Sequence, residues 1–241
     1  MGFLSGQIAV VTGASSGIGK AITLSLANEG AQICLVGRNL ENLEAVASRA
    51  KQFSENISIY KTDLGIDDDV RLLAVSLQKE FGAIDILIHS AGVISIAKIE
   101  QASIEDFDYQ YRINVRAPYL LTQAFLPILK LRRGQVVFIN SSAGLTAKAG
   151  VGQYAATKHA LKAIADSLRE EVNADGVRVI TVYPGRTAGP MQAALHEMEK
   201  RAYFPEKLMQ PGDVAAVVVN ALSLARTAEA TDICVRPLNK P

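Results

Sequence analysis

The feature of this sequence that most constrains its fold is a nearly unbroken alternation of short apolar runs with longer helical patterns. Valine, isoleucine and leucine dominate most of the apolar runs with little alternation, as in strands buried on both faces of a sheet. We expect strands at residues 7–12, 32–37, 56–61, 84–89, 135–140, 177–183 and 232–235. We expect helices at residues 17–28, 40–54, 67–81, 104–131, 151–173 and 212–224. This order predicts an α/β fold: a doubly wound, parallel, seven-stranded sheet with helices on both faces.

A glycine-rich segment joins the first predicted strand to the first predicted helix. Gly13 allows a tight turn, Gly17 lets the backbone approach a phosphate, and Gly19 lets the helix pack close to the strand. The start of the helix then offers N–H groups and the positive end of its dipole to an anion. We therefore expect a pyrophosphate site at Gly13, Ser15, Ser16, Gly17, Ile18 and Gly19.

Three other interpretations of this segment stay open. Residues 13–17 also match the G-x-S-x-G turn of serine hydrolases, for which His159 or His196 could complete a triad. Gly19-Lys20 resembles the end of a P-loop, although Ala21 replaces the hydroxyl that binds the metal ion. The glycines could also form a turn without any ligand.

The residue after the second predicted strand indicates which dinucleotide is bound. A site for NAD(H) normally carries a carboxylate there for the ribose 2′-hydroxyl, whereas this chain has Arg38. A guanidinium can form a paired contact with a 2′-phosphate, so the sequence favours NADP(H). In the alternative, Arg38 is an ordinary solvated charge at the end of a strand.

A second group of residues indicates acid–base chemistry. Tyr154 and Lys158 lie four positions apart on a predicted helix and therefore share one face, and Ser141 follows the fifth predicted strand. Reduction of a ketone needs a hydride on carbon and a proton on oxygen, and a phenol near an ammonium group can supply the proton. We expect Lys158 to lower the pKa of Tyr154 and Ser141 to donate a hydrogen bond to the substrate oxygen.

Taken together, these motifs resemble those of the short-chain dehydrogenase/reductase family in its compact, single-domain, NADP(H)-preferring form. The resemblance extends over about the whole chain, from the segment at 12–19 to Tyr154-x-x-x-Lys158 and Pro184-Gly185. It implies a Rossmann-type fold and an oxidoreductase that acts on carbonyls and secondary alcohols. The motifs that carry it further are Asp63, Ala91-Gly92, Asn114 and Ser141.

The resemblance also implies a role for each matching position. Asn114, Ser141, Tyr154 and Lys158 would be catalytic, with Asn114 helping to keep a water molecule for a proton relay. The cofactor would contact Asp63, Leu64, Ser90, Ala91, Gly92, Tyr154, Lys158, Pro184, Gly185 and Thr187 in addition to the glycine-rich segment and Arg38. The chain departs from the family pattern in two places. His89-Ser90 stands where two asparagines are common, and Gly189 stands where a threonine is favoured.

Two further functions are compatible with the same motifs. One is a 3-oxoacyl-(acyl-carrier-protein) reductase, which applies the same chemistry to a tethered thioester. The other is a catalytically silent dinucleotide-binding module, although such a module is expected to lack Tyr154 or Lys158. Residues 186–208 and 93–100 are expected to shape the substrate pocket.

Composition narrows the possible partners. The net charge of +1 leaves no basic surface for nucleic acid, and no apolar run approaches the roughly 20 residues of a membrane span. No secretion signal opens the chain, so we expect a cytoplasmic protein that acts on a small-molecule carbonyl or alcohol. Apolar surface on the helices at 104–131 and 151–173 suggests a homodimer or homotetramer.

No linker divides the sequence, so we expect one domain over residues 1–241, with a flap at about 185–211 where prolines interrupt helical patches. Cys34 and Cys234 are expected to be buried thiols and His196 to be solvated, and no metal site is expected.

Overall fold

The computed structural model describes residues 2–238 and contains one parallel sheet. Its seven strands lie in the order β3-β2-β1-β4-β5-β6-β7, which confirms the predicted doubly wound sheet. The strands are β1 (Ile8–Thr12), β2 (Gln32–Gly37), β3 (Ile57–Lys61), β4 (Ile86–His89), β5 (Gln135–Ile139), β6 (Arg178–Pro184) and β7 (Asp232–Val235). The single-domain prediction also covers residue 1 and residues 239–241, which lie outside the described residues.

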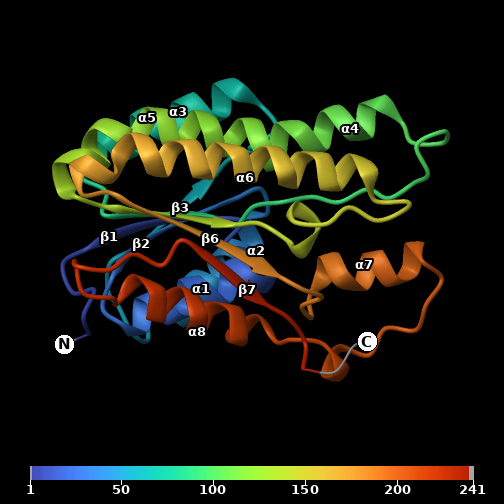
Figure 1. Cartoon of the computed structure of the whole chain (residues 1–241). Helices are drawn as coiled ribbons and strands as arrows, with labels where there is room; N and C mark the ends of the chain where they lie inside the picture. Colours follow the sequence, from blue (N-terminus) through green and yellow to red (C-terminus); the bar gives the residue numbers. More distant parts are fainter. Residues whose placement is uncertain (1, 239–241) are drawn as a thin grey trace.

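Helices cover both faces of the sheet (Figure 1). One face carries α3 (Asp67–Phe81), α4 (Ile104–Tyr111), α5 (Ala117–Arg132) and α6 (Gly152–Val172). The other carries α1 (Gly17–Asn28), α2 (Leu40–Ala50) and α8 (Pro211–Leu222). A shorter helix, α7 (Pro190–Met198), lies within the segment that the sequence analysis assigned to a flap.

Each face of the sheet has its own apolar core. Ile22 of α1, Leu43 of α2 and Val214 of α8 pack on one side of the strands. Leu77 of α3 and Phe125 of α5 belong to the core on the other side. Central strands such as β5 are buried along their whole length, because helices cover both of their faces, which explains their unbroken apolar sequence.

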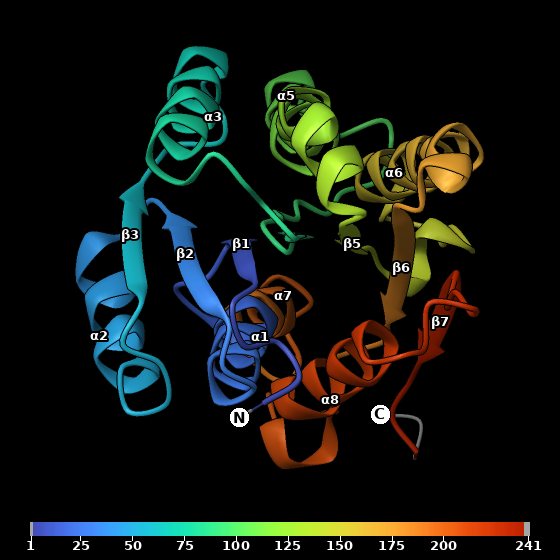
Figure 2. The ribbon, with the colours of Figure 1, turned by 90° about the vertical axis from the view of Figure 1, so that its left-hand side faces the viewer.

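The winding of the sheet changes direction between β1 and β4, which are neighbours although they are far apart in sequence. Figure 2 shows β2 and β3 on one side of β1 and the later strands β5, β6 and β7 on the other. Helices that follow strands on either side of this point leave the sheet in different directions, so a crevice opens beyond the carboxyl ends of the strands. Thr12 joins the two strand ends there. Its hydroxyl donates to the carbonyl of Ile88 at 3.2 Å and accepts the backbone N–H groups of Ser90 and Ala91.

The predicted helix at 104–131 is wrong as a single α-helix. A π-helical turn at Arg112–Arg116 separates α4 from α5 and carries Asn114 at its centre. Such turns arise where side-chain contacts compete with the regular backbone ladder, and the Asn114 side chain makes three hydrogen bonds outside its own helix. Sequence periodicity does not report contacts of this kind.

Two predictions about single side chains are also wrong. Cys234 is exposed because β7 is the edge strand of the sheet, whereas Cys34 is buried in β2 and its burial raises the pKa of the thiol to about 12. His196 is buried because the Tyr203 ring packs against it edge-on, with the ring centroids 5.3 Å apart. The exposure of Cys234 depends on the place of β7 at the edge of the sheet, and the burial of His196 depends on a ring that follows it within the same segment.

Candidate active site

A cavity of about 700 Å³ lies beyond the carboxyl ends of the central strands, where the sheet changes direction. It brings together most of the residues that the sequence analysis selected. They are Gly13, Ser15, Ser16, Gly17, Ile18, Gly19, Arg38, Leu64, Ser90, Ala91, Gly92, Ser141, Tyr154, Lys158, Pro184, Gly185 and Thr187. Asp63 and Asn114 are not among the residues that line it, although their sequence neighbours Leu64 and Ile113 are.

The glycine-rich turn forms the floor of one end of the cavity. Gly13 has a φ of +67°, and a Cβ atom there would lie 2.8 Å from the backbone of Ala91. A Cβ atom on Gly19 would lie 2.2 Å from the carbonyl oxygen of Gly13, so only glycine lets α1 start this close to β1. At Gly17 a Cβ atom would meet nothing within 4 Å, because that backbone faces open space. The Ser16 side chain does not cap α1, so the first N–H groups of the helix remain available to an anion.

His89, the first residue of the His89-Ser90 departure from the pattern that the motifs resemble, has a structural role here. His89 is buried at the end of β4, stacks on Phe138 and makes a 2.9 Å hydrogen bond with the Thr122 hydroxyl of α5. Burial lowers the pKa of His89 to about 3, so the imidazole is neutral. It therefore fastens α5 to the sheet beneath the cavity and adds no charge to it.

From the glycine-rich turn, the cavity extends to the carboxyl ends of β2 and β3. Arg38 lines the cavity there, and Leu64 lines it from the turn after β3. The Asp63 carboxylate accepts the backbone N–H of Gly65 at 2.9 Å and thereby shapes that turn. Asp63 thus acts on the cavity wall through the backbone of the turn that carries Leu64.

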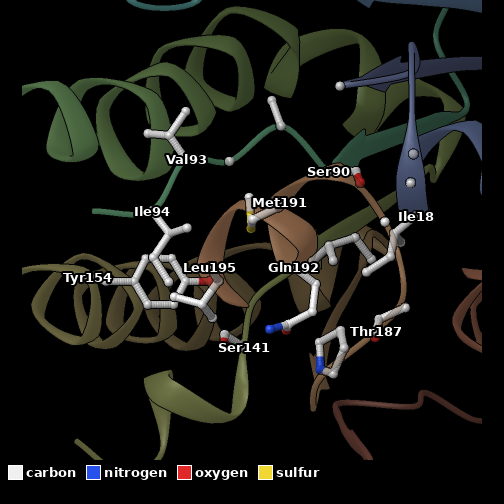
Figure 3. Close-up of a pocket in the computed structure, with 18 of the residues that line it drawn as sticks. Ile18, Ser90, Val93, Ile94, Ser141, Tyr154, Thr187, Met191, Gln192 and Leu195 are labelled. Atoms are coloured by element: carbon white, nitrogen blue, oxygen red, sulfur yellow. The ribbon is translucent and has the colours of Figure 1, made fainter. Parts of the chain in front are cut away.

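Ser141, Tyr154 and Lys158 meet on the other side of the cavity. Figure 3 shows the Tyr154 ring and Ser141 near each other, with Ile94 and Leu195 beside the ring. Tyr154 and Lys158 are 8% and 3% exposed, and the ammonium nitrogen lies 5.8 Å from the centre of the Tyr154 ring. Lys158 also donates to the backbone carbonyl of Ile139 at 3.2 Å. The adjacent Ser142 is exposed, whereas Ser141 is half-buried, in agreement with the choice of Ser141.

The charges of this pair follow from burial. Burial raises the pKa of Tyr154 above its usual value of 10, and the hydrogen bond with Ser141 opposes that rise. Burial lowers the pKa of Lys158 to about 8. The sequence analysis expected Lys158 to lower the pKa of Tyr154, but enclosure of the phenol has the larger effect. Tyr154 is therefore protonated near neutral pH, as a proton donor must be.

Two asparagines hold this group in place. Asn114 bridges the backbone N–H and carbonyl of Val93, each at 2.9 Å, and donates to the Thr157 hydroxyl at 3.0 Å. Asn140, which sequence reasoning missed, accepts the N–H of Ser141 at 2.8 Å and donates to the carbonyl of Lys158 at 3.1 Å. A polar residue at the buried end of β5 was the available signal. The two amides together fix the Ser141 loop and α6 relative to the sheet.

The flap supplies the opposite wall. Figure 3 shows Met191, Gln192 and Leu195 of α7 directed into the cavity opposite Tyr154. Arg186 at the base of the flap forms a two-pronged ion pair with Glu199 at the end of α7, at 2.6 and 2.9 Å. Residues 186–208 were expected to shape the pocket, and Met191, Gln192 and Leu195 are among the side chains of this segment that line it.

Gly189 begins α7 on the side of the phosphate turn. It has a φ of +154°, and a Cβ atom there would lie 3.6 Å from the Cα atom of Gly17. The Tyr203 hydroxyl accepts the backbone N–H of Gly189 at 2.9 Å, so a residue from the far side of the flap fastens the position where the family favours threonine. The Thr187 hydroxyl donates a hydrogen bond to the backbone carbonyl of Gly185, at 3.1 Å.

The segment after Ser141 is a part of the wall that the sequence analysis did not anticipate. Leu145, Thr146, Lys148 and Val151 all line the cavity between the end of β5 and α6. Their place beyond a central parallel strand was the signal that could have identified them.

Comparisons with known proteins agree with this geometry. A family model described as short chain dehydrogenase matches residues 7–200. An uncharacterized oxidoreductase of Staphylococcus aureus is 33% identical over 239 residues, which cover 99% of this chain and all of the relative.

Solved structures are also similar. One is the alcohol dehydrogenase from the archaeon Thermococcus sibiricus, complexed with 5-hydroxy-NADP, with a TM-score of 0.87, 26% identity and 98% coverage of both chains. Another is the L-sorbose reductase from Gluconobacter frateurii, complexed with NADPH and L-sorbose. It has a TM-score of 0.88 and 27% identity, with 96% of this chain and 95% of that one covered.

Two searches within residues 2–238 bear on other kinds of site. None of the helices there combines the length and apolar content that crossing a membrane requires. Within the same residues, no three His, Cys, Asp or Glu side chains are grouped so that they could hold a metal ion.

Proposed function

The chain belongs to the short chain dehydrogenase family of oxidoreductases, and from this we propose that it transfers hydride between NADP(H) and the carbonyl or secondary alcohol of a small molecule. The observation that carries the proposal is the placement of Ser141, Tyr154 and Lys158 in the same cavity as the glycine-rich turn. The phenol, the hydroxyl and the ammonium group of these residues can act together on the oxygen of a substrate carbonyl, and the glycine-rich turn can bind a pyrophosphate.

The residues present fit a phosphorylated dinucleotide. The open backbone at Gly17 and the uncapped start of α1 suit the pyrophosphate, and Arg38 suits a 2′-phosphate. Leu64 and Ser90 to Gly92 line the path between these points and the catalytic side chains. The similar structures that contain NADP or NADPH support the same choice of cofactor. NADPH, when bound, would supply the hydride that adds to the carbonyl carbon.

The protein side of the reaction is a proton transfer. The Tyr154 hydroxyl donates its proton to the carbonyl oxygen as the C–O bond becomes a single bond, and Ser141 donates a hydrogen bond to the same oxygen. The Lys158 ammonium, beside the Tyr154 ring, stabilises the phenolate that remains. Because the pKa of Lys158 is about 8, its ammonium group can release a proton more readily than an ordinary lysine does. Alcohol oxidation reverses each of these transfers.

Asn114 contributes by position. Both N–H donors of its side chain are used in holding Val93 and Thr157, so any water in a proton relay that needs a donor would be held by other groups, such as the backbone of the π-helical turn. We expect this turn to lead from Lys158 toward solvent.

The family's pairing of helices suggests the state of assembly. Tyr119 and Leu131 of α5 are exposed on the outer side of that helix. We propose that α5 and α6 pack against a second copy to form a homodimer or homotetramer, which sedimentation equilibrium would detect.

The decisive experiment replaces Tyr154 with phenylalanine. Without the proton donor, we expect kcat for NADPH-dependent reduction, across carbonyls graded by size, to fall at least about a thousandfold. The Kd for NADPH should stay within a few-fold, because the phenol is not needed to hold the dinucleotide. Tyr111→Phe, at an exposed tyrosine outside the cavity, is the matched control.

Equal turnover by Tyr154→Phe and the wild type would reject the proposed role. Binding of NADPH without turnover of any carbonyl by the wild type would favour the catalytically silent module instead.

A further inference from the structure

A tyrosine from α4 lies against the cation that we assign to the cofactor phosphate. Arg38 follows β2, and its guanidinium donates a hydrogen bond to the hydroxyl of Tyr109, 71 positions later. Nothing in the spacing of the sequence motifs connects these residues, because Tyr109 belongs to none of the family's motifs.

The ring of Tyr109 is held at the edge of the cavity by the turn after β3. A Cβ atom on Gly65 would lie 3.4 Å from the ring carbon Cε2 of Tyr109, so the ring packs on that turn. The neighbouring Leu64 and Arg38 both line the cavity. The phenol therefore stands beside the space that an adenosine 2′-phosphate would occupy.

The surroundings of Arg38 leave it available for a phosphate. Among residues 2–238, the ion pairs do not include Arg38, so no carboxylate there competes for its guanidinium. A guanidinium has five N–H donors, and Tyr109 occupies one of them without adding charge. The neutral hydroxyl of Tyr109 thus orients the guanidinium of Arg38 and leaves the other N–H donors of the guanidinium for an anion.

The hydroxyl of Tyr109 has a donor of its own. Its oxygen accepts the N–H of Arg38, and its proton is then directed away from the guanidinium, where a phosphate oxygen can accept it. We propose that Tyr109 is a second residue of the 2′-phosphate site, which both orients Arg38 and donates its hydroxyl proton to the phosphate. The proposal rests on the proposed function, since it specifies how that site distinguishes NADP(H) from NAD(H).

The test uses ligands that differ by one phosphate. Isothermal titration calorimetry of Tyr109→Phe would measure Kd for 2′,5′-ADP and for 5′-AMP, and for NADP⁺ and NAD⁺. The variant keeps the ring that packs on Gly65 and removes only the hydroxyl. We expect a roughly tenfold weaker Kd for 2′,5′-ADP and NADP⁺, the size expected for loss of a hydrogen bond to a charged group, and no change for 5′-AMP and NAD⁺.

Tyr111→Phe is the matched control, because this tyrosine is exposed near the end of the same helix. A second comparison adds Arg38→Ala. In that background Tyr109→Phe should weaken NADP⁺ binding by clearly less than tenfold, because part of its effect acts through the guanidinium.

Equal weakening of the phosphorylated and unphosphorylated ligands, or no weakening at all, would overturn the inference. Failure of the proposed function gives a different result. In that case wild-type protein would either bind neither NADP⁺ nor NADPH, or bind NADPH without reducing any carbonyl, whatever residue stood at position 109.

Discussion

The two ends of the cavity are built in different ways. At the end formed by β1 and α1, contacts depend on the backbone, on glycines that leave no room for a side chain, and on Thr12, which ties β1 to β4. At the flap end, contacts depend on side chains, including the Arg186–Glu199 ion pair and the Tyr203–Gly189 hydrogen bond. Ser141, Tyr154 and Lys158 lie between the two.

This difference fits what each end has to recognise. A pyrophosphate is the same in every dinucleotide, and backbone N–H groups at a helix start bind it without regard to side chains. A substrate differs from one member of the family to another, and side chains on a connecting segment can vary without disturbing the sheet. A small side-chain substitution should therefore reduce stability and NADPH affinity strongly at the first end. At the second end it should have a smaller effect, confined to substrate binding.

The largest effect is expected at Gly19. In Gly19→Ala the new methyl group would lie 2.2 Å from the Gly13 carbonyl oxygen, so α1 must move away from β1. We expect a loss of stability of roughly 2–4 kcal/mol and loss of most NADPH affinity, from urea denaturation and ligand titration.

Gly212→Ala is the control, because Gly212 also lies in the first turn of a helix but has nothing within 4 Å of a Cβ atom. It should be neutral or stabilising by up to about 1 kcal/mol. If Gly19→Ala bound NADPH as well as the wild type does, the close approach of backbone would not be what makes this end rigid.

The next effect concerns Lys158, between the two ends. Its pKa of about 8 in the fold lies below the usual 10.5, so the unfolded chain binds this proton more tightly. Stability should therefore rise with pH between about 8 and 10.5. Lys158→Met removes this dependence.

We expect the stability of Lys158→Met relative to the wild type to be about 2 kcal/mol greater at pH 7 than at pH 9.5, by urea denaturation. A constant difference between the two proteins over this range would show that the lysine is hydrated. In that case the partly dry setting assumed for proton transfer would be wrong.

The smallest effect is expected at the flap. Glu199→Gln weakens the ion pair that fastens α7 to Arg186, and both side chains are only partly exposed. We expect KM for the carbonyl substrate to rise roughly fivefold, which corresponds to about 1 kcal/mol, with Kd for NADPH unchanged. Steady-state kinetics and NADPH titration measure the two quantities separately.

Glu206→Gln, at an exposed carboxylate in the same segment, should leave KM unchanged. An equal loss in NADPH affinity for Glu199→Gln would show that the flap also serves the phosphate end, and the contrast drawn above would not hold.

The order of the elements was predictable from the sequence because strands and helices have local apolar periods of their own. Four elements, including β2 and α1, begin and end at the predicted residues. Errors concentrate where contacts are distant in sequence. The π-helical turn at Asn114 depends on Val93 and Thr157, and the exposure of Cys234 depends on the place of β7 at the edge of the sheet.

The candidate site shows the same division. The glycine-rich turn and the Tyr154–Lys158 pair could be recognised in the sequence because each depends on the spacing of residues that lie close together in the chain. Asn140 and Tyr109 were missed, since each acquires its meaning from a partner on another element, namely Lys158 and Arg38.

The sequence alone determined the parallel α/β fold, the phosphate turn and the chemical groups available for proton transfer, because these follow from local periodicity and from the absence of a side chain on glycine. Only the tertiary structure decided which side chains surround those groups and what charge they carry. Burial depends on every element that packs around a residue, and it is burial that raises the pKa of Tyr154 and lowers the pKa of Lys158.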